Sequence, residues 1–266
     1  MRVLNKLRIA AITIAATIIA GCHGFPKKLD ETAVWTNETL YAEAQNAFTT
    51  GNWRKCSEYF ELLQGRDSFG HCAQQAQINV AYCEWKDNKI ASAKQVINRF
   101  IQLHPDHPDI AYAYYLKGLM SFNANLDLFS RLTGQDITEL DPQALRDSHN
   151  AFRVIVEQHP SSKYAPDAAQ RMRYIVNALA SHEAHTADYY YRRGAYIAAI
   201  NRAKIVLQEY KNSPATEDAL HLMILSYHAL NLPQLANDAQ RILTSTFPNS
   251  LYVTDHSYAL RKDENL

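Results

Sequence analysis

The sequence predicts an all-α fold, a superhelical solenoid of about five stacked helix pairs. Three observations carry this prediction: the 266 residues include only 8 Gly, 47% of them are hydrophobic, and one turn pattern recurs along the chain. The scarcity of Gly argues against turn-rich β folds, which need special backbone angles. The hydrophobic content argues against disorder, and 27 basic against 27 acidic residues give no support to nucleic-acid binding.

Residues 1–21 match a lipoprotein signal peptide. Three basic residues precede an uncharged apolar run at 9–19, which is too short to span a bilayer. The run leads into Ile-Ala-Gly-Cys, ending at Cys22. This string resembles the lipobox of bacterial lipoproteins, which implies cleavage between Gly21 and Cys22 and lipidation of Cys22. The alternative is a short signal-anchor helix with an incidental Cys.

The lipid anchor has consequences for location and charge. A diacylglycerol and an N-acyl chain on Cys22 supply the several lipid groups that stable anchoring needs. Residue 23 is His rather than the Asp that tends to retain lipoproteins at the inner membrane, which favours the outer membrane, facing the periplasm. Loss of three basic residues leaves 24 basic against 27 acidic, so the mature chain is mildly acidic. Residues 22–37 then form a polar tether.

The body of the chain, residues 38–253, repeats a unit of two antiparallel helices, the tetratricopeptide (TPR) unit. One pair cannot bury its apolar face alone, so neighbouring pairs must stack into a solenoid. The alternative is an irregular helix bundle. The signature of the unit is a turn residue followed five positions later by a small residue that lets helices approach closely, as in Gly51/Cys56, Asn88/Ala93, Gly194/Ala199 and Asn231/Ala236.

The repeats fall into an N-terminal group at about 38–160 and a C-terminal group at about 161–253, followed by a polar tail at 254–266. An insertion at 123–141 interrupts the third unit, and we interpret it as a loop partly packed on the surface. Two dipeptides predict helix starts with an N-cap and a Pro at the first helical position: Asp141-Pro142 and Ser213-Pro214.

Three cysteines, Cys56, Cys72 and Cys83, remain in the mature chain. An odd number cannot all pair internally in an oxidising compartment. Each lies in a helical pattern among Ala, Tyr and Phe, so we favour three small buried hydrophobic residues. A bridge between Cys56 and Cys83 is the alternative. The sequence has no CxxC or Cys/His metal spacing.

Several strings along the mature chain go beyond TPR positions. The most specific is Tyr189-Tyr190-x-x-Arg193-Gly194-Ala195-Tyr196, followed by Asn201-Arg202. Others are Gly51-Asn52-Trp53-Arg54, Phe69-Gly70, Arg99-Phe100-Ile101, Asp141-Pro142-Gln143 and Pro160-x-Ser162-x-Tyr164. Together they resemble the BamD family of ComL-type outer-membrane assembly lipoproteins. The chain departs from that family in its many His and Tyr, its three internal cysteines and its charged tail.

The resemblance implies a non-enzymatic subunit of the β-barrel assembly (BAM) machinery with five TPRs. Its C-terminal repeats would dock on the POTRA domains of a BamA-type insertase, beside other BAM lipoproteins. Its N-terminal repeats would form a groove for unfolded outer-membrane proteins. Arg202 matches the family's Asn-Arg position, and we expect Arg193 and Arg202 to dock the insertase, because Arg pairs bidentately with carboxylates.

The predicted groove is lined by the inner faces of the first helices of the first three units. Aromatic rings there suit an extended client segment, because they give large contact area with few frozen torsions. The alternative for each ring is burial in the repeat core. The predicted groove residues are Tyr41, Gln45, Phe48, Ile78, Tyr82, Trp85, Tyr112, Tyr115 and Phe122.

The sequence contains no complete motif for catalysis or metal binding. His182-Glu183-Ala184-His185 has one residue too few for the HExxH zinc motif, and no third ligand is suitably spaced. The sequence also has no Gly-rich phosphate loop, GxSxG or Cys nucleophile signature. We therefore expect no metal, no cofactor beyond the lipid on Cys22, and no enzyme activity. The alternative function is a periplasmic TPR lipoprotein that coordinates cell-wall synthesis.

Overall fold

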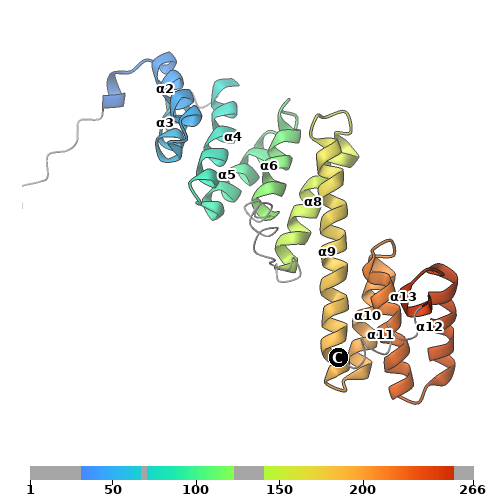
Figure 1. Ribbon diagram of the computed structural model, residues 1–266. Helices are drawn as coiled ribbons and strands as arrows, with labels where there is room; N and C mark the ends of the chain where they lie inside the picture. Colours follow the sequence, from blue (N-terminus) through green and yellow to red (C-terminus); the bar gives the residue numbers. More distant parts are fainter. Residues whose placement is uncertain (1–30, 67–70, 123–140, 255–266) are drawn as a thin grey trace, which may run out of the picture.

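The computed structural model describes residues 31–66, 71–122 and 141–254 of the chain (Figure 1). The signal peptide, Cys22, most of the tether, all but the last residue of the insertion at 123–141 and nearly all of the tail therefore lie outside the described residues. Among the helices of the described ranges, none is both long and apolar enough to cross a membrane.

The described chain is helical throughout and confirms the predicted fold class. A short 3-10 turn, η1 (Glu31–Val34), precedes five antiparallel helix pairs, which follow one another in an elongated array (Figure 1). The pairs are α2 (Asn37–Thr49) with α3 (Trp53–Arg66), α4 (His71–Lys86) with α5 (Ile90–Leu103), α6 (Ile110–Phe122) with α8 (Pro142–Gln158), α9 (Ala165–Arg192) with α10 (Tyr196–Glu209), and α11 (Ala215–Ala229) with α12 (Pro233–Thr246). A last turn, α13 (Leu251–Thr254), closes the array.

The four predicted turns have a common backbone geometry. Gly51, Asn88, Gly194 and Asn231 have φ values of 74°, 63°, 72° and 57°, a left-handed conformation that Gly and Asn adopt most easily. In each turn the next residue donates its N–H back to a carbonyl five positions earlier, as from Asn52 to Ala47 at 2.8 Å. The small residues that follow, Cys56, Ala93, Ala199 and Ala236, are all 0% exposed. The predicted repeat register is thus confirmed.

The two predicted helix starts differ in detail. Asp141 caps α8 by accepting the N–H of Gln143 at 2.9 Å, and Pro142 is the first helical residue, as predicted. Ser213 accepts the N–H of Ala215 at 3.3 Å, but α11 begins at Ala215. The start lies one residue later than predicted, because Pro214 itself occupies the N-cap position.

The core runs through the stacked pairs, and α6 and α8 approach each other closely at Gly118. Phe152 of α8 is fully buried and its ring faces Gly118 of α6. A Cβ on Gly118 would lie within 2.8 Å of three carbon atoms of that ring. The buried hydroxyl of Ser148 donates to the Gly118 carbonyl at 2.9 Å. Gly118 is therefore required by close approach rather than by backbone angles.

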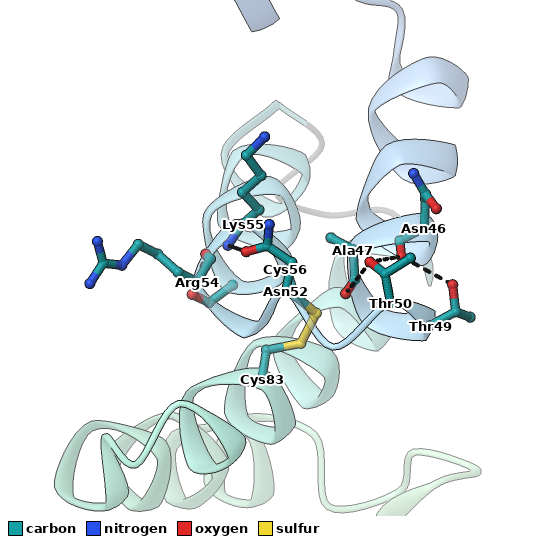
Figure 2. Close-up of a disulfide and its surroundings, with 10 residues drawn as sticks. Asn46, Ala47, Thr49, Thr50, Asn52, Arg54, Lys55, Cys56 and Cys83 are labelled. Carbon is teal, nitrogen blue, oxygen red and sulfur yellow. Dashed lines mark hydrogen bonds between the residues drawn. A yellow bond between two sulfur atoms is a disulfide. The ribbon is translucent and has the colours of Figure 1, made fainter.

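A disulfide joins Cys56 of α3 to Cys83 of α4, with Cα atoms 5.9 Å apart (Figure 2). The interpretation of three unpaired buried thiols was therefore wrong for these two residues. Both are fully buried and face each other where α3 contacts α4. The bridge links the second helix of the first pair to the first helix of the next. The side chain of Cys72 lies outside the described residues.

Candidate interaction surfaces

A first aromatic cluster joins the first two helix pairs. Phe48 of α2 lies 5.1 Å from Tyr82 of α4, measured between ring centroids, and 6.0 Å from Trp53 of α3. Tyr82 also contacts Trp53 at 6.0 Å and Trp85 at 5.9 Å. All four rings are partly exposed. Aromatic pairs at such separations stabilise each other beyond the apolar area they bury, by about 0.5–1.5 kcal/mol.

A lysine and the disulfide adjoin this first aromatic cluster. The ammonium of Lys86 lies 5.1 Å from the Trp85 ring centroid and 5.8 Å from that of Tyr82, within cation–π range. Burial raises the pKa of the Tyr82 phenol, so the phenol is neutral at physiological pH. Cys83 directly follows Tyr82, so the bridge fixes α4 against α3 beside the rings.

A second aromatic cluster lies between α6 and the start of α9. Tyr164 stacks on Tyr112 at 5.3 Å and on Tyr115 at 4.9 Å. The Tyr115 hydroxyl donates to Asp167 at 2.7 Å, and Arg171 pairs with the same carboxylate at 2.6 Å. Burial raises the pKa of Asp167, but hydrogen bonds from Arg171 and Tyr115 and the charge of Arg171 hold it below its usual value. This network therefore fixes the Tyr115 ring.

The two clusters are neighbours, although they belong to different helix pairs. Burial raises the pKa of Tyr112 strongly, and the charge that Tyr82 would carry on ionisation raises it further. The rings of Tyr82 and Tyr112 both pack against the same core cluster, which is formed by residues of α4, α5 and α6. The first helices α4 and α6 thus present one aromatic surface, to which α2 contributes Phe48.

The structure separates the nine predicted groove residues into three groups. Phe48, Tyr82, Trp85, Tyr112 and Tyr115 belong to the two clusters. Tyr41 and Gln45 of α2 form the second group. Tyr41 is 45% exposed, and its hydroxyl accepts a hydrogen bond from the side-chain amide of Gln45 at 3.1 Å.

Ile78 and Phe122 form the third group, and they do not line a groove. Ile78 is 0% exposed and packs in the core between α4, α5 and α6, and Phe122 is 4% exposed and packs against α8 and α9. Their places in the helical repeat turn them toward neighbouring helices. Trp53 and Tyr164, which complete the clusters, are not among the predicted groove residues. Both stand at helix starts beside turns, outside the helices that were counted.

The structure does not bring the two predicted docking arginines together. Arg202 of α10 pairs with Glu183 of α9 at 3.0 Å, and the Glu183 side chain is only 9% exposed. Arg193 is the C-cap residue of α9 and is exposed. Its guanidinium carbon lies 4.6 Å from the centroid of the Tyr189 ring. Ten residues of α9 separate Glu183 from Arg193, which corresponds to about 15 Å at the usual helical rise. Arg202 thus has an internal carboxylate partner that the sequence analysis did not expect.

His182 and His185 of α9 line a shallow cavity of about 320 Å³ with Thr186, Tyr189 and Tyr190, whereas Glu183 and Ala184 between them are buried. Glu183 points away to Arg202, so it does not join the two imidazoles. Over the ranges that the structure describes, no three His, Cys, Asp or Glu side chains are grouped to hold a metal ion.

These features define a helical-repeat scaffold of the TPR type, with an aromatic surface on its N-terminal pairs and the Arg202–Glu183 ion pair between α9 and α10. The comparison with protein families gives a more specific class. Residues 35–242 match the family model YfiO, described as outer membrane lipoprotein. The chain belongs to this family, and curated BamD proteins are among its relatives.

Several curated relatives cover most of the chain. "Outer membrane protein assembly factor BamD" of Neisseria gonorrhoeae is 41% identical over 220 residues, 83% of this chain and 82% of the relative. The BamD of Xylella fastidiosa strain Temecula1 is 32% identical over 92% of this chain and 84% of the relative. The BamD of Vibrio cholerae is 29% identical over 86% of this chain and 94% of the relative.

Among solved structures, TPR-like repeats of a kinesin light chain from Podosopora anserina cover 80% of this chain at 12% identity, with a TM-score of 0.36. The assignment of the repeats rests on the helix pairs and turns described above.

Proposed function

We propose that this chain is a non-enzymatic, lipid-anchored factor for the assembly of outer-membrane proteins, held through Cys22 on the periplasmic side of the outer membrane. The relatives named as outer membrane protein assembly factors support this role, because they align over more than four-fifths of both chains. The lipobox-like string before Cys22 supports the anchor. A helical solenoid offers extended docking surfaces, which suits a scaffold.

The observation that carries the client-binding part of the proposal is the shared aromatic surface of α2, α4 and α6. Its rings are partly exposed and fixed by mutual contacts, by Lys86 and by the Asp167 network. Rigid rings lose little entropy when an extended segment binds. We infer that unfolded outer-membrane proteins bind here through apolar and aromatic side chains.

The docking part of the proposal concerns the C-terminal pairs. Arg202 is 41% exposed, so part of its guanidinium is accessible while it pairs with Glu183. A guanidinium has five N–H donors and can serve two carboxylates at once. We infer that Arg202 bridges Glu183 to a carboxylate of an insertase POTRA domain. Arg193, exposed on Tyr189, would contribute at the edge of the same interface.

Affinity purification from detergent-solubilised envelopes tests the proposed assembly. The tagged, lipidated chain should recover a barrel-forming insertase and accessory lipoproteins. Recovery of cell-wall synthases without an insertase would contradict the proposal and support the alternative role in wall synthesis. The lipid on Cys22 can be checked in the same material, because intact-mass measurement distinguishes an acylated N-terminus from an unprocessed one.

The client surface yields a separate prediction. Tyr82→Ala combined with Trp85→Ala, both in the first aromatic cluster, should weaken binding of a peptide from the aromatic end of an outer-membrane protein by about tenfold or more, because aromatic residues dominate such interfaces. Fluorescence anisotropy with a labelled peptide measures the affinity. A matched control is Leu235→Ala with Ile242→Ala, which removes exposed apolar side chains from α12. Unchanged affinity in the first variant, or an equal loss in the control, would contradict the assignment.

A further inference from the structure

A polar cavity of about 400 Å³ opens between α5, α6 and α8. Its size falls within the range of about 300–1,000 Å³ that is common for small-molecule sites. Its lining is dominated by hydrogen-bond donors and cations from three helices. The lining residues are Lys94 and Asn98 of α5, Tyr114, Lys117 and Ser121 of α6, and Asp147, Asn150, Ala151, Arg153 and Val154 of α8.

The charges in this cavity do not balance. It holds three cationic side chains against one carboxylate, Asp147. Lys94 and Lys117 are half-buried and have no ion pair within the parts of the chain that the structure describes. Arg153 approaches Glu157 only loosely, at 3.9 Å, and Asp147 accepts the amide of Gln143 at 2.9 Å. Among the described residues that line the cavity, the cationic side chains therefore outnumber the carboxylates by two.

The cavity is separate from the aromatic surface. Each residue of an α-helix advances about 100° around the axis, so Tyr114, Lys117 and Ser121 share one face of α6. Tyr112 and Tyr115 lie on the opposite side of the helix, against Tyr164. A ligand in the cavity would therefore leave the proposed client surface free.

We propose that this cavity binds a phosphate group, either free or carried by a lipid headgroup. A phosphate monoester carries a charge of about −1.5 to −2 at neutral pH, which matches the excess of cations over carboxylates. Lysine ammonium groups bind phosphate as point charges, and arginine binds it through paired N–H donors. The hydroxyls of Tyr114 and Ser121 and the amides of Asn98 and Asn150 surround the same volume and can donate to phosphate oxygens.

Calorimetric titration of the full, detergent-solubilised protein tests this proposal. The probes are inorganic phosphate and short-chain dihexanoyl phosphatidic acid. Lys94→Gln with Lys117→Gln should weaken binding of both probes by at least about tenfold, since each lysine contributes a charge-assisted contact. Asp147→Asn should tighten binding by several-fold, because it removes the single carboxylate of the cavity. Lys204→Gln with Lys211→Gln, on exposed sites of the C-terminal half, should change nothing.

The outcomes separate the two sources of phosphate. Equal affinity for both probes points to free phosphate, and affinity at least tenfold higher for phosphatidic acid points to a lipid headgroup. No binding of either probe overturns the proposal, as does an equal loss in the Lys204/Lys211 control. If circular dichroism shows that the lysine variant does not fold, the titration of Asp147→Asn tests the proposal instead. Unchanged or weaker phosphate binding by Asp147→Asn would then overturn it.

Discussion

Arg202→Glu is expected to cost about 3 kcal/mol of unfolding free energy and to abolish recovery of the insertase. The change places a second carboxylate against Glu183, whose side chain is 9% exposed and 3.0 Å from the present guanidinium. Breaking a buried ion pair typically costs about 3–5 kcal/mol, and the 41% exposure of Arg202 puts this pair near the lower end. Urea unfolding followed by circular dichroism measures the loss.

A second substitution separates the structural role of Arg202 from its docking role. In the Arg202→Glu background, Glu183→Gln removes the repulsion between carboxylates and should restore most of the stability. Insertase recovery should stay lost, because the partner carboxylate still meets a negative charge. Arg193→Glu is the matched exposed control and should change stability by less than about 0.5 kcal/mol. If the double variant regains the insertase, Arg202 has no docking role of its own.

Phe152→Ala is expected to cost about 3–5 kcal/mol, the usual loss for truncating a fully buried Phe. Gly118→Ala should also destabilise, by up to about 2 kcal/mol. Its methyl group would overlap the Phe152 ring, and overpacking of about 1–3 kcal/mol outweighs the gain of about 1 kcal/mol in helix propensity. Denaturant unfolding of both single variants provides the measurement.

The pair of substitutions gives a sharper test, because the effect of Gly118→Ala should change sign. With Phe152→Ala in place the ring is gone, so the added methyl group should stabilise by up to about 1 kcal/mol. Gly65→Ala in α3 is the matched control, since a Cβ there meets nothing within 4 Å. It should be neutral or slightly stabilising in both backgrounds. A destabilising Gly118→Ala in the Phe152→Ala background would show that the cost does not come from the ring.

The sequence predicted the repeat architecture well because the turns carry local chemistry. A left-handed turn residue and a small residue five positions later are readable from residue types alone, and all four matched the structure. The start of α8 was predictable for the same reason, since Asp141 and Pro142 act within one turn. The start of α11 shifted by one residue, because Pro214 can serve as an N-cap as well as a first helical residue.

The surfaces were predicted less well, because they depend on how neighbouring pairs stack. Counting along first helices selected Ile78 and Phe122, which the adjacent pairs bury, and passed over Trp53 and Tyr164 beside the turns. The pairing of Arg202 with Glu183 joins two residues that lie 19 positions apart on consecutive helices, and it has no local signal. The same applies to the disulfide, because three cysteines in helical patterns do not reveal which two face each other.

The Cys56–Cys83 bridge also bears on how the protein is made. Thiols stay reduced in the cytosol, so the bridge forms only where oxidants are available, as in the bacterial periplasm. Material expressed without a signal peptide would therefore carry two buried thiols at the junction that orients the first aromatic cluster. Protein prepared with and without export would differ in this one covalent bond, so the peptide-binding measurements proposed above should use the oxidised form.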